Sequence, residues 1–191
     1  MNLPNRLTVL RIFLAPVFLA LLTIRFPGHF LLALLVFIAA SLTDLADGKI
    51  ARSRGLVTDF GKFLDPLADK MLTTAAFIGF IGLGFGCGIV WITMIVLTRE
   101  FLITSLRLTA AGSGRVIAAN IWGKAKTVCQ MAAIIATLVY YSVGDISALP
   151  GAFSDILHVL SVVLLWISAG MTVLSGAIYL KDNAGFINTN K

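Results

Sequence analysis

Long apolar stretches alternate with short polar breaks along the chain. A helix that crosses a bilayer needs about 20 mostly apolar residues, and six stretches reach or approach that length. They cover residues 7–24, 30–45, 63–83, 89–111, 126–143 and 156–180. Turn-forming residues separate them, such as Pro27-Gly28 after the first and the glycine-rich run 82–88 after the third. We therefore predict an all-α integral membrane protein with a bundle of six transmembrane helices, the second continuing to Arg52.

Composition supports lipid as the main solvent. Of the 191 residues, 59% are hydrophobic and 13% are charged, whereas about a quarter of a soluble domain is charged. Six spans leave little chain for an extramembrane region, so residues 1–191 are predicted to form a single membrane domain. Cys87 and Cys129 lack the spacing of metal ligands and are interpreted as buried packing residues.

The distribution of positive charge predicts the orientation. The net charge of +6 comes from basic residues at the ends of apolar stretches, a pattern that favours membrane orientation over a nucleic-acid partner. If the N-terminus faces the cytoplasm, the opposite side receives only Arg25 among the loop cations. Both termini are therefore expected in the cytoplasm. A short interfacial helix is expected over residues 2–6, with Arg6 and Arg11 reaching lipid phosphates.

Four aspartates stand at helical spacing on either side of one polar break. Asp44 and Asp47 are three residues apart at the end of the second predicted helix, and Asp65 and Asp69 are four apart at the start of the third. Residues at these spacings share a helix face. Because a short loop makes the two helices antiparallel neighbours, the four carboxylates are expected to converge at the cytoplasmic edge of the bilayer.

Carboxylates gathered in a partly desolvated pocket repel one another unless cations neutralise them. Oxygen ligands of this kind suit Mg²⁺ or Mn²⁺, and two such ions form the usual clamp for an in-line phosphoryl displacement. Gly48 and Gly61 leave room for a phosphate-linked group near the backbone. Ala51 keeps the same face open, and Arg52 can give two donors to a phosphate. A single aspartate here, such as Asp59, would be read as a helix cap.

The segment resembles the CDP-alcohol phosphatidyltransferase family. It matches the signature D-x2-D-G-x2-A-R-x8-G-x3-D-x3-D at every fixed position, namely Asp44, Asp47, Gly48, Ala51, Arg52, Gly61, Asp65 and Asp69. The resemblance implies six transmembrane helices, a homodimer and a two-metal site reached from the cytoplasm and the leaflet. It implies that Asp44, Asp47 and Asp65 hold metal, and that Asp69 is the general base and also touches a metal. It implies that Gly48, Ala51, Arg52 and Gly61 bind CDP-diacylglycerol.

Further segments resemble the bacterial branch of this family that makes phosphatidylglycerophosphate. They are Asn2-Leu-Pro-Asn5, residues 64–70, Arg99-Glu100, Leu106-Arg107 and residues 123–130. The resemblance implies a transferase of the bacterial inner membrane with its active site facing the cytoplasm. Such an enzyme moves the phosphatidyl group from CDP-diacylglycerol to glycerol 3-phosphate and releases CMP.

Glycerol 3-phosphate is a dianion, so its pocket needs cations. The candidates for binding its phosphate near the cytoplasmic ends of the fourth and fifth helices are Lys126, Thr127, Gln130, Arg107, Arg115 and Lys124. The first three share one helix face and are favoured, whereas the positive-inside rule also explains Arg115 and Lys124. Arg99 and Glu100 lie deeper in an apolar helix and are predicted to form an internal ion pair or network.

The sequence is also compatible with two other functions. The same chemistry could use another acceptor, such as an inositol phosphate, serine or phosphatidylglycerol. A cation or proton transporter would also place carboxylates in a membrane. The clustering of the aspartates at one membrane face, rather than along a path through the bilayer, favours the transferase.

Overall fold

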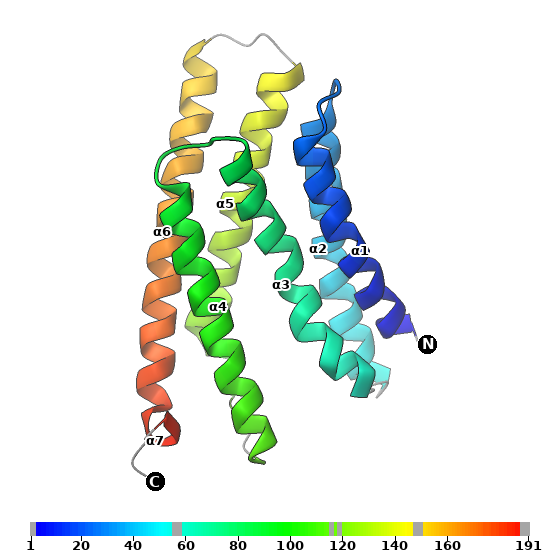
Figure 1. The fold of residues 1–191 in the computed structure, drawn as a ribbon, viewed down its shortest axis with the longest axis vertical. Helices are drawn as coiled ribbons and strands as arrows, with labels where there is room; N and C mark the ends of the chain where they lie inside the picture. The colour runs from blue at the N-terminus through cyan, green and yellow to red at the C-terminus, as the bar shows by residue number, and fades with distance from the viewer. Residues whose placement is uncertain (1–2, 55–58, 115–116, 118–119, 147–150, 188–191) are drawn as a thin grey trace.

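The computed structural model describes the backbone of residues 3–54, 59–114, 117, 120–146 and 151–187. The side chains of residues 44–63 and of Asp65 lie outside the described part. Within it the protein is all-helical, and six long helices run side by side (Figure 1). They are α1 (Leu3–Thr23), α2 (His29–Arg54), α3 (Asp59–Gly82), α4 (Ile89–Gly112), α5 (Ile121–Ile146) and α6 (Gly151–Asp182), followed by the short α7 (Ala184–Ile187).

Each predicted apolar stretch corresponds to one helix, but several helices extend beyond the apolar residues. Helix α5 begins at Ile121, ahead of the predicted start, because the side-chain oxygen of Asn120 accepts a hydrogen bond from the Gly123 N–H at 2.9 Å and caps the helix. Helix α1 begins at Leu3. The described residues therefore show no separate interfacial helix before the first span, since residues 3–6 form the first turn of α1.

The helices pack as two groups of three that share one core. Helix α1 packs against α2 and α3, α5 packs extensively against α6, and α2–α5, α3–α4 and α4–α6 contacts join the groups. The aromatic rings of Phe18 and Phe37 meet at 5.5 Å between α1 and α2. Phe77 and Phe80 of α3 and Ile134 of α5 are also fully buried in the same core. This core fixes the relative rotation of the helices and so decides which polar side chains face inward.

The outer surface of the bundle is apolar. Four of the helices in the described part are long and apolar enough to cross a membrane, namely those spanning Asn5–Thr23, Ile89–Gly112, Ile121–Asp145 and Gly151–Asp182. Helix α2 has a shorter apolar segment, His29–Thr43. Large hydrophobic side chains such as Phe13, Leu35 and Trp91 are exposed on these helices. Exposed apolar side chains over whole helices indicate an integral membrane protein.

The turn between α3 and α4 depends on backbone conformations with positive φ. Gly84, Gly86 and Gly88 have φ between 67° and 78°, and Cys87 has φ 48°. The indole N–H of Trp166 donates to the Cys87 carbonyl at 3.1 Å, and a Cβ on Gly88 would lie 2.9 Å from the Trp166 ring. Cys87 is exposed in this turn. The interpretation of Cys87 as a buried packing residue is therefore wrong, whereas Cys129 is partly buried.

Candidate active site

The two halves of the aspartate signature lie at the same end of the bundle. Helix α2 ends at Arg54 and α3 begins at Asp59, so Asp44 and Asp47 fall on the last turns of α2, and Asp65 and Asp69 fall on the first turns of α3 (Figure 1). Of these four aspartates, the described part includes only the side chain of Asp69. The predicted side-chain roles of Gly48, Ala51, Arg52 and Gly61 also fall outside it.

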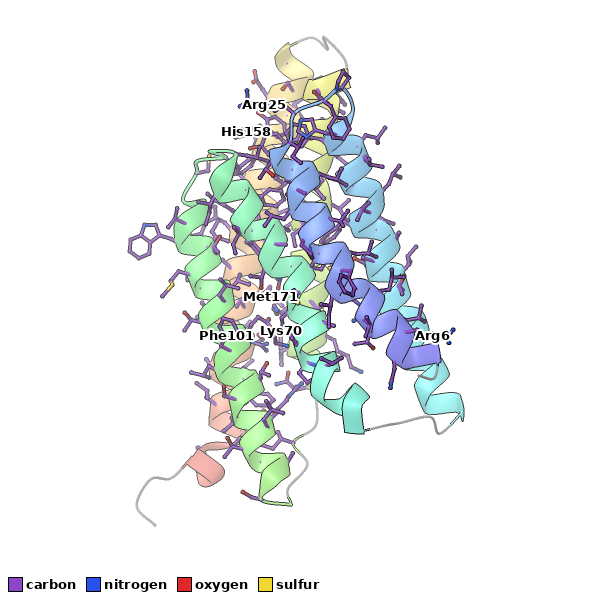
Figure 2. The ribbon with its side chains drawn as sticks, turned by 45° about the vertical axis from the view of Figure 1, so that its right-hand side comes forward. Arg6, Arg25, Lys70, Phe101, His158 and Met171 are labelled. Carbon is purple, nitrogen blue, oxygen red and sulfur yellow. The ribbon has the colours of Figure 1, made fainter. Side chains whose placement is uncertain are left out.

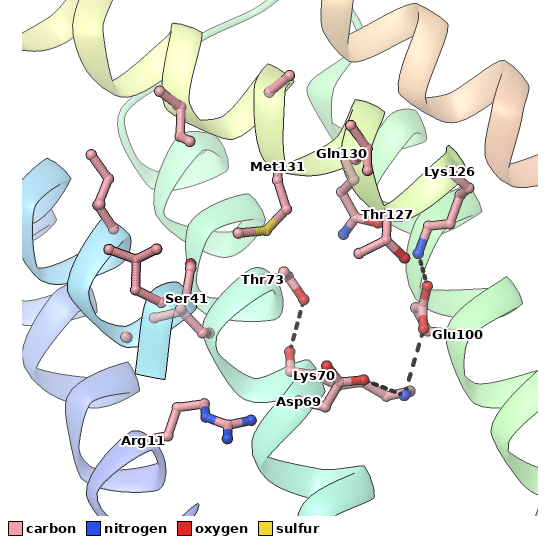
Figure 3. A pocket seen from close by; sticks show the side chains of 17 residues that line it. Arg11, Ser41, Asp69, Lys70, Thr73, Glu100, Lys126, Thr127, Gln130 and Met131 are labelled. Atoms are coloured by element: carbon pink, nitrogen blue, oxygen red, sulfur yellow. Dashed lines mark hydrogen bonds and ion pairs between the residues drawn. The ribbon is translucent and has the colours of Figure 1, made fainter. Parts of the chain in front are cut away.

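A cavity of about 520 Å³ opens beside Asp69, among α1, α2, α3, α4 and α5 (Figure 3). One part of its wall is polar and is formed by Arg11, Ser41, Asp69, Lys70, Thr73, Glu100, Lys126, Thr127 and Gln130. The other part is apolar and is formed by Ile38, Ala40, Leu42, Leu72, Val128, Met131, Ala132 and Ile135. The cavity thus has a charged region and an apolar region, which suits a molecule with a charged head and an apolar body.

Glu100 is the centre of a charged network in the cavity wall. Lys126 donates a hydrogen bond to Glu100 Oε1, and the Lys70 Nζ lies 3.6 Å from Oε2. The Arg99 guanidinium lies 3.6 Å from Oε1. Lys70 also donates to Asp69 Oδ2 at 3.3 Å, so the network runs from Asp69 through Lys70 and Glu100 to Lys126 (Figure 3). The predicted internal network around Arg99 and Glu100 is confirmed, and it joins α3, α4 and α5.

The charges of this network leave a positive surplus. The side chain of Glu100 is 14% exposed and that of Lys126 is 5% exposed, and ions at such depth are costly unless they are paired. Within the described side chains, Lys70, Arg99 and Lys126 supply three positive charges against the two carboxylates of Asp69 and Glu100. Among the described side chains, the cavity wall itself carries the cations Arg11, Lys70 and Lys126 and the carboxylates Asp69 and Glu100. A wall with more cations than carboxylates attracts an anion.

Arg11 also lines the cavity and is a site residue that the sequence analysis missed. It is 4% exposed, so the expectation that it reaches lipid phosphates is wrong, whereas Arg6 is exposed on the same helix. Asn5 and Thr8 are buried as well. The spacing 5, 8, 11 continues the inward face that Ala15 and Phe18 form higher in α1. This spacing was the feature of the sequence from which the inward position of Arg11 could have been predicted.

The predicted phosphate-binding residues do not all meet at the cavity. Lys126, Thr127 and Gln130 line it together from one face of α5. Arg107 does not belong to the wall that the described residues form: its Nε donates to the Tyr179 hydroxyl at 2.9 Å, and its guanidinium lies 5.2 Å from the centre of that ring. Lys124 is exposed in the first turn of α5. Arg115 lies outside the described residues.

The chain is similar to known proteins over nearly its whole length. The family model for CDP-alcohol phosphatidyltransferases matches residues 1–174. A Bacillus subtilis (strain 168) protein named CDP-diacylglycerol–glycerol-3-phosphate 3-phosphatidyltransferase is 39% identical over 201 residues, which cover 99% of this chain and 98% of that protein. A Rickettsia bellii protein of the same name is 35% identical and covers 94% of each chain. A Mycobacterium tuberculosis (H37Rv) protein named probable phosphatidylglycerophosphate synthase is 38% identical over 98% of this chain and 86% of its own. The chain therefore belongs to the CDP-alcohol phosphatidyltransferase family.

Proposed function

We propose that the protein transfers the phosphatidyl group of CDP-diacylglycerol to glycerol 3-phosphate, giving phosphatidylglycerophosphate and CMP. The observation that carries this proposal is the cavity in which Asp69 of the family signature shares a wall with Lys70 and Lys126. A carboxylate that can accept a proton thus lies beside cations that suit a dianionic acceptor. The names of relatives that are 35% to 39% identical over nearly the whole chain support the same donor and acceptor.

Asp44, Asp47, Asp65 and Asp69 are the proposed ligands of Mg²⁺ or Mn²⁺. Their carboxylates are the hard oxygen donors that these ions prefer. Asp69 supports the fit because its side chain is 59% exposed and lines the cavity. Its signature partners stand on the adjoining ends of α2 and α3. When bound, the ions would neutralise the diphosphate of the donor.

Asp69 is the proposed general base. In the proposed step it takes the proton from the 1-hydroxyl of glycerol 3-phosphate as that oxygen bonds to the phosphorus attached to diacylglycerol. The bond between this phosphorus and the oxygen of CMP breaks, and CMP leaves. Lys70 holds the Asp69 carboxylate at the cavity wall through its 3.3 Å hydrogen bond. Lys70 and Lys126 would attract the acceptor phosphate to the same wall.

The apolar part of the cavity is the proposed place for the lipid end of the donor. It lies between α2 and α5, where Leu42 and Val128 are exposed at the side of the bundle. A diacylglycerol group could therefore remain in the leaflet while its phosphate reaches Asp69. Gly48, Ala51, Arg52 and Gly61 are proposed to contact the cytidine diphosphate part. Lys124 and Arg115 are proposed to add positive charge around the acceptor, whereas Arg107 is engaged by Tyr179.

All six long helices are proposed to cross the bacterial inner membrane, in one domain that covers residues 1–191. Helices α2 and α3 have 26 and 24 residues, which correspond to lengths of about 39 and 36 Å. Arg25 lies at the opposite end of the bundle from Arg6 (Figure 2). The charge bias therefore supports cytoplasmic termini and a cavity that opens toward the cytoplasm. A homodimer is proposed from the family resemblance.

Release of CMP from CDP-diacylglycerol tests the proposed function. Purified protein in detergent would be assayed with and without glycerol 3-phosphate, and with Mg²⁺, Mn²⁺ or a chelator. We expect release only when both a divalent ion and glycerol 3-phosphate are present. Release that needs the ion but responds to serine or an inositol phosphate instead would overturn the acceptor. Absence of release with every acceptor, together with cation flux in proteoliposomes, would favour a transporter.

A further inference from the structure

Gln130 is a buried polar side chain whose amide oxygen has no hydrogen-bond partner in the described part of the chain. It is 3% exposed, it lines the cavity from α5, and its Oε1 has no partner there (Figure 3). Most buried polar groups in folded proteins are paired, so an unpaired amide oxygen needs an explanation. In the wall of a cavity, a ligand that completes the hydrogen bonds provides one.

The chemistry of the amide indicates which ligand group it can bind. An amide presents one oxygen that accepts and one NH₂ group that donates, and rotation by 180° exchanges their places. An ionised phosphate has oxygens that only accept, so it cannot satisfy the amide oxygen. A hydroxyl group both donates and accepts, and it can satisfy the two ends of the amide at once. The unpaired oxygen of Gln130 therefore suits a hydroxyl better than a phosphate.

The position of Gln130 indicates which hydroxyl it meets. Gln130 follows Lys126 by four residues on one face of α5, about 6 Å along the helix axis. Lys126 belongs to the charged network, whereas Met131 and Ile135 beyond it belong to the apolar wall. A three-carbon phosphate whose phosphate lies at Lys126 and Lys70 would place its middle carbon within reach of the amide.

We propose that Gln130 is a specificity-determining residue that binds the 2-hydroxyl of the acceptor, and this inference rests on the proposed function. The amide oxygen accepts a hydrogen bond from the hydroxyl, and the amide N–H donates one to the hydroxyl oxygen. An acceptor without this hydroxyl would leave the buried amide unpaired in the complex. A site built to pair with a hydroxyl rejects an analogue that lacks it. Gln130 is thereby assigned to the glycerol part of the acceptor rather than to its phosphate.

A comparison of two acceptors tests this assignment. Glycerol 3-phosphate and 3-hydroxypropyl phosphate share the attacking hydroxyl and the phosphate, and only the former has a 2-hydroxyl. We expect the wild type to prefer glycerol 3-phosphate by about 10- to 100-fold in kcat/KM, the cost of leaving a buried polar group unpaired. In Gln130→Met, which has a similar length and no amide, kcat/KM for glycerol 3-phosphate should fall by that factor. The value for 3-hydroxypropyl phosphate should stay unchanged.

Ile134→Leu is the matched control, because it conserves volume at a buried position of α5 outside the cavity wall that the described residues form. It should leave the preference between the two acceptors as it is in the wild type. The Tm of Gln130→Met without ligand should equal or exceed that of the wild type, since the substitution removes an unpaired amide. A lower Tm, or an equal fall in kcat/KM for both acceptors, would show a structural or donor-binding role and overturn the inference.

The acceptor preference of the wild type distinguishes a failure of this inference from a failure of the proposed function. Equal use of the two acceptors by the wild type would overturn the role of Gln130 and leave the proposed function standing. If the wild type failed with glycerol 3-phosphate but used another alcohol, the proposed acceptor would be wrong, and this inference would be wrong with it.

Discussion

Lys126 on α5 donates a hydrogen bond to the carboxylate of Glu100 on α4, inside a bundle whose outer surface is apolar. The same carboxylate lies 3.6 Å from Lys70 of α3. Glu100 therefore keeps two ammonium groups from two other helices at the wall of one cavity. Without this carboxylate, the two like charges would repel each other where little water screens them.

We predict that Glu100→Gln lowers both stability and turnover. Removal of one member of a buried ion pair costs about 3–5 kcal/mol, because the remaining charge is left without its partner. Glu100→Gln leaves Lys70, Arg99 and Lys126 without their shared carboxylate, so we expect a large decrease in Tm. Lys126→Gln leaves Glu100 with two cations and should lower Tm less. Thermal unfolding in detergent measures the decrease in Tm of each variant, and CMP release measures the turnover.

The double variant Glu100→Gln with Lys126→Gln tests whether these two residues stabilise the protein as a pair or independently. It should recover part of the lost stability, with a coupling energy of about 1–3 kcal/mol. Ser105→Ala, at an exposed position of α4, is the control and should leave Tm unchanged. If the stability lost in the double variant equalled the sum of the losses in the two single variants, the proposed pairing would be contradicted.

Asp69→Asn should lower kcat by about 10²- to 10⁴-fold, because an amide cannot take the proton of the acceptor hydroxyl. Much of the metal binding should remain, since the other three aspartates are unchanged. CMP release and metal titration by calorimetry measure the two properties separately. Asp155→Asn, which changes an exposed carboxylate near the start of α6, is the control. Near-native turnover by Asp69→Asn would exclude its role as the base.

Two glycines of α6 should respond differently to alanine. A Cβ on Gly176 would lie 3.2 Å from Cγ of Arg99, whereas a Cβ on Gly170 meets no described atom within 4 Å. Alanine is favoured over glycine inside a helix by about 1 kcal/mol. Gly170→Ala should therefore raise Tm slightly. Gly176→Ala should lower Tm, because Arg99 must move and crowding in a packed core costs about 1–3 kcal/mol.

Thermal unfolding and CMP release of the two alanine variants check this prediction. Gly176→Ala should also reduce turnover, since displacement of Arg99 disturbs its ion pair with Glu100. Equal Tm values for the two variants would show that Arg99 has room to adjust.

The proposed orientation predicts which cysteine a membrane-impermeant maleimide reaches from outside. Cys87 is exposed in the α3–α4 turn, at the end of the bundle opposite the aspartates. In Cys129→Ser, intact spheroplasts should therefore become labelled at Cys87. A cysteine at exposed Ser113, placed in a variant without the native cysteines, should react only after permeabilisation. The reverse pattern would place both termini outside the cytoplasm.

The helices and the aspartate signature could be predicted from the sequence because both are local properties. A run of apolar residues must form a helix in lipid, since the backbone has no water to pair with. Spacings of three and four residues place aspartates on one helix face wherever the helix lies. The shared face of Lys126 and Gln130 followed from the same rule, and both line the cavity. Helix ends were less predictable, since a single residue such as Asn120 can move them.

The tertiary structure decided which residues from different helices meet. Glu100 and Lys126 are 26 positions apart, and their contact depends on how α4 and α5 rotate about their axes, which the packing of the core sets. The same rotation turns Arg11 inward and directs Arg107 to Tyr179 rather than to the cavity. Local patterns in the sequence are therefore sufficient to predict the helices and the aspartate motif. The ion partners, and the lack of a partner for the Gln130 amide oxygen among the described residues, depend on how one helix packs on another.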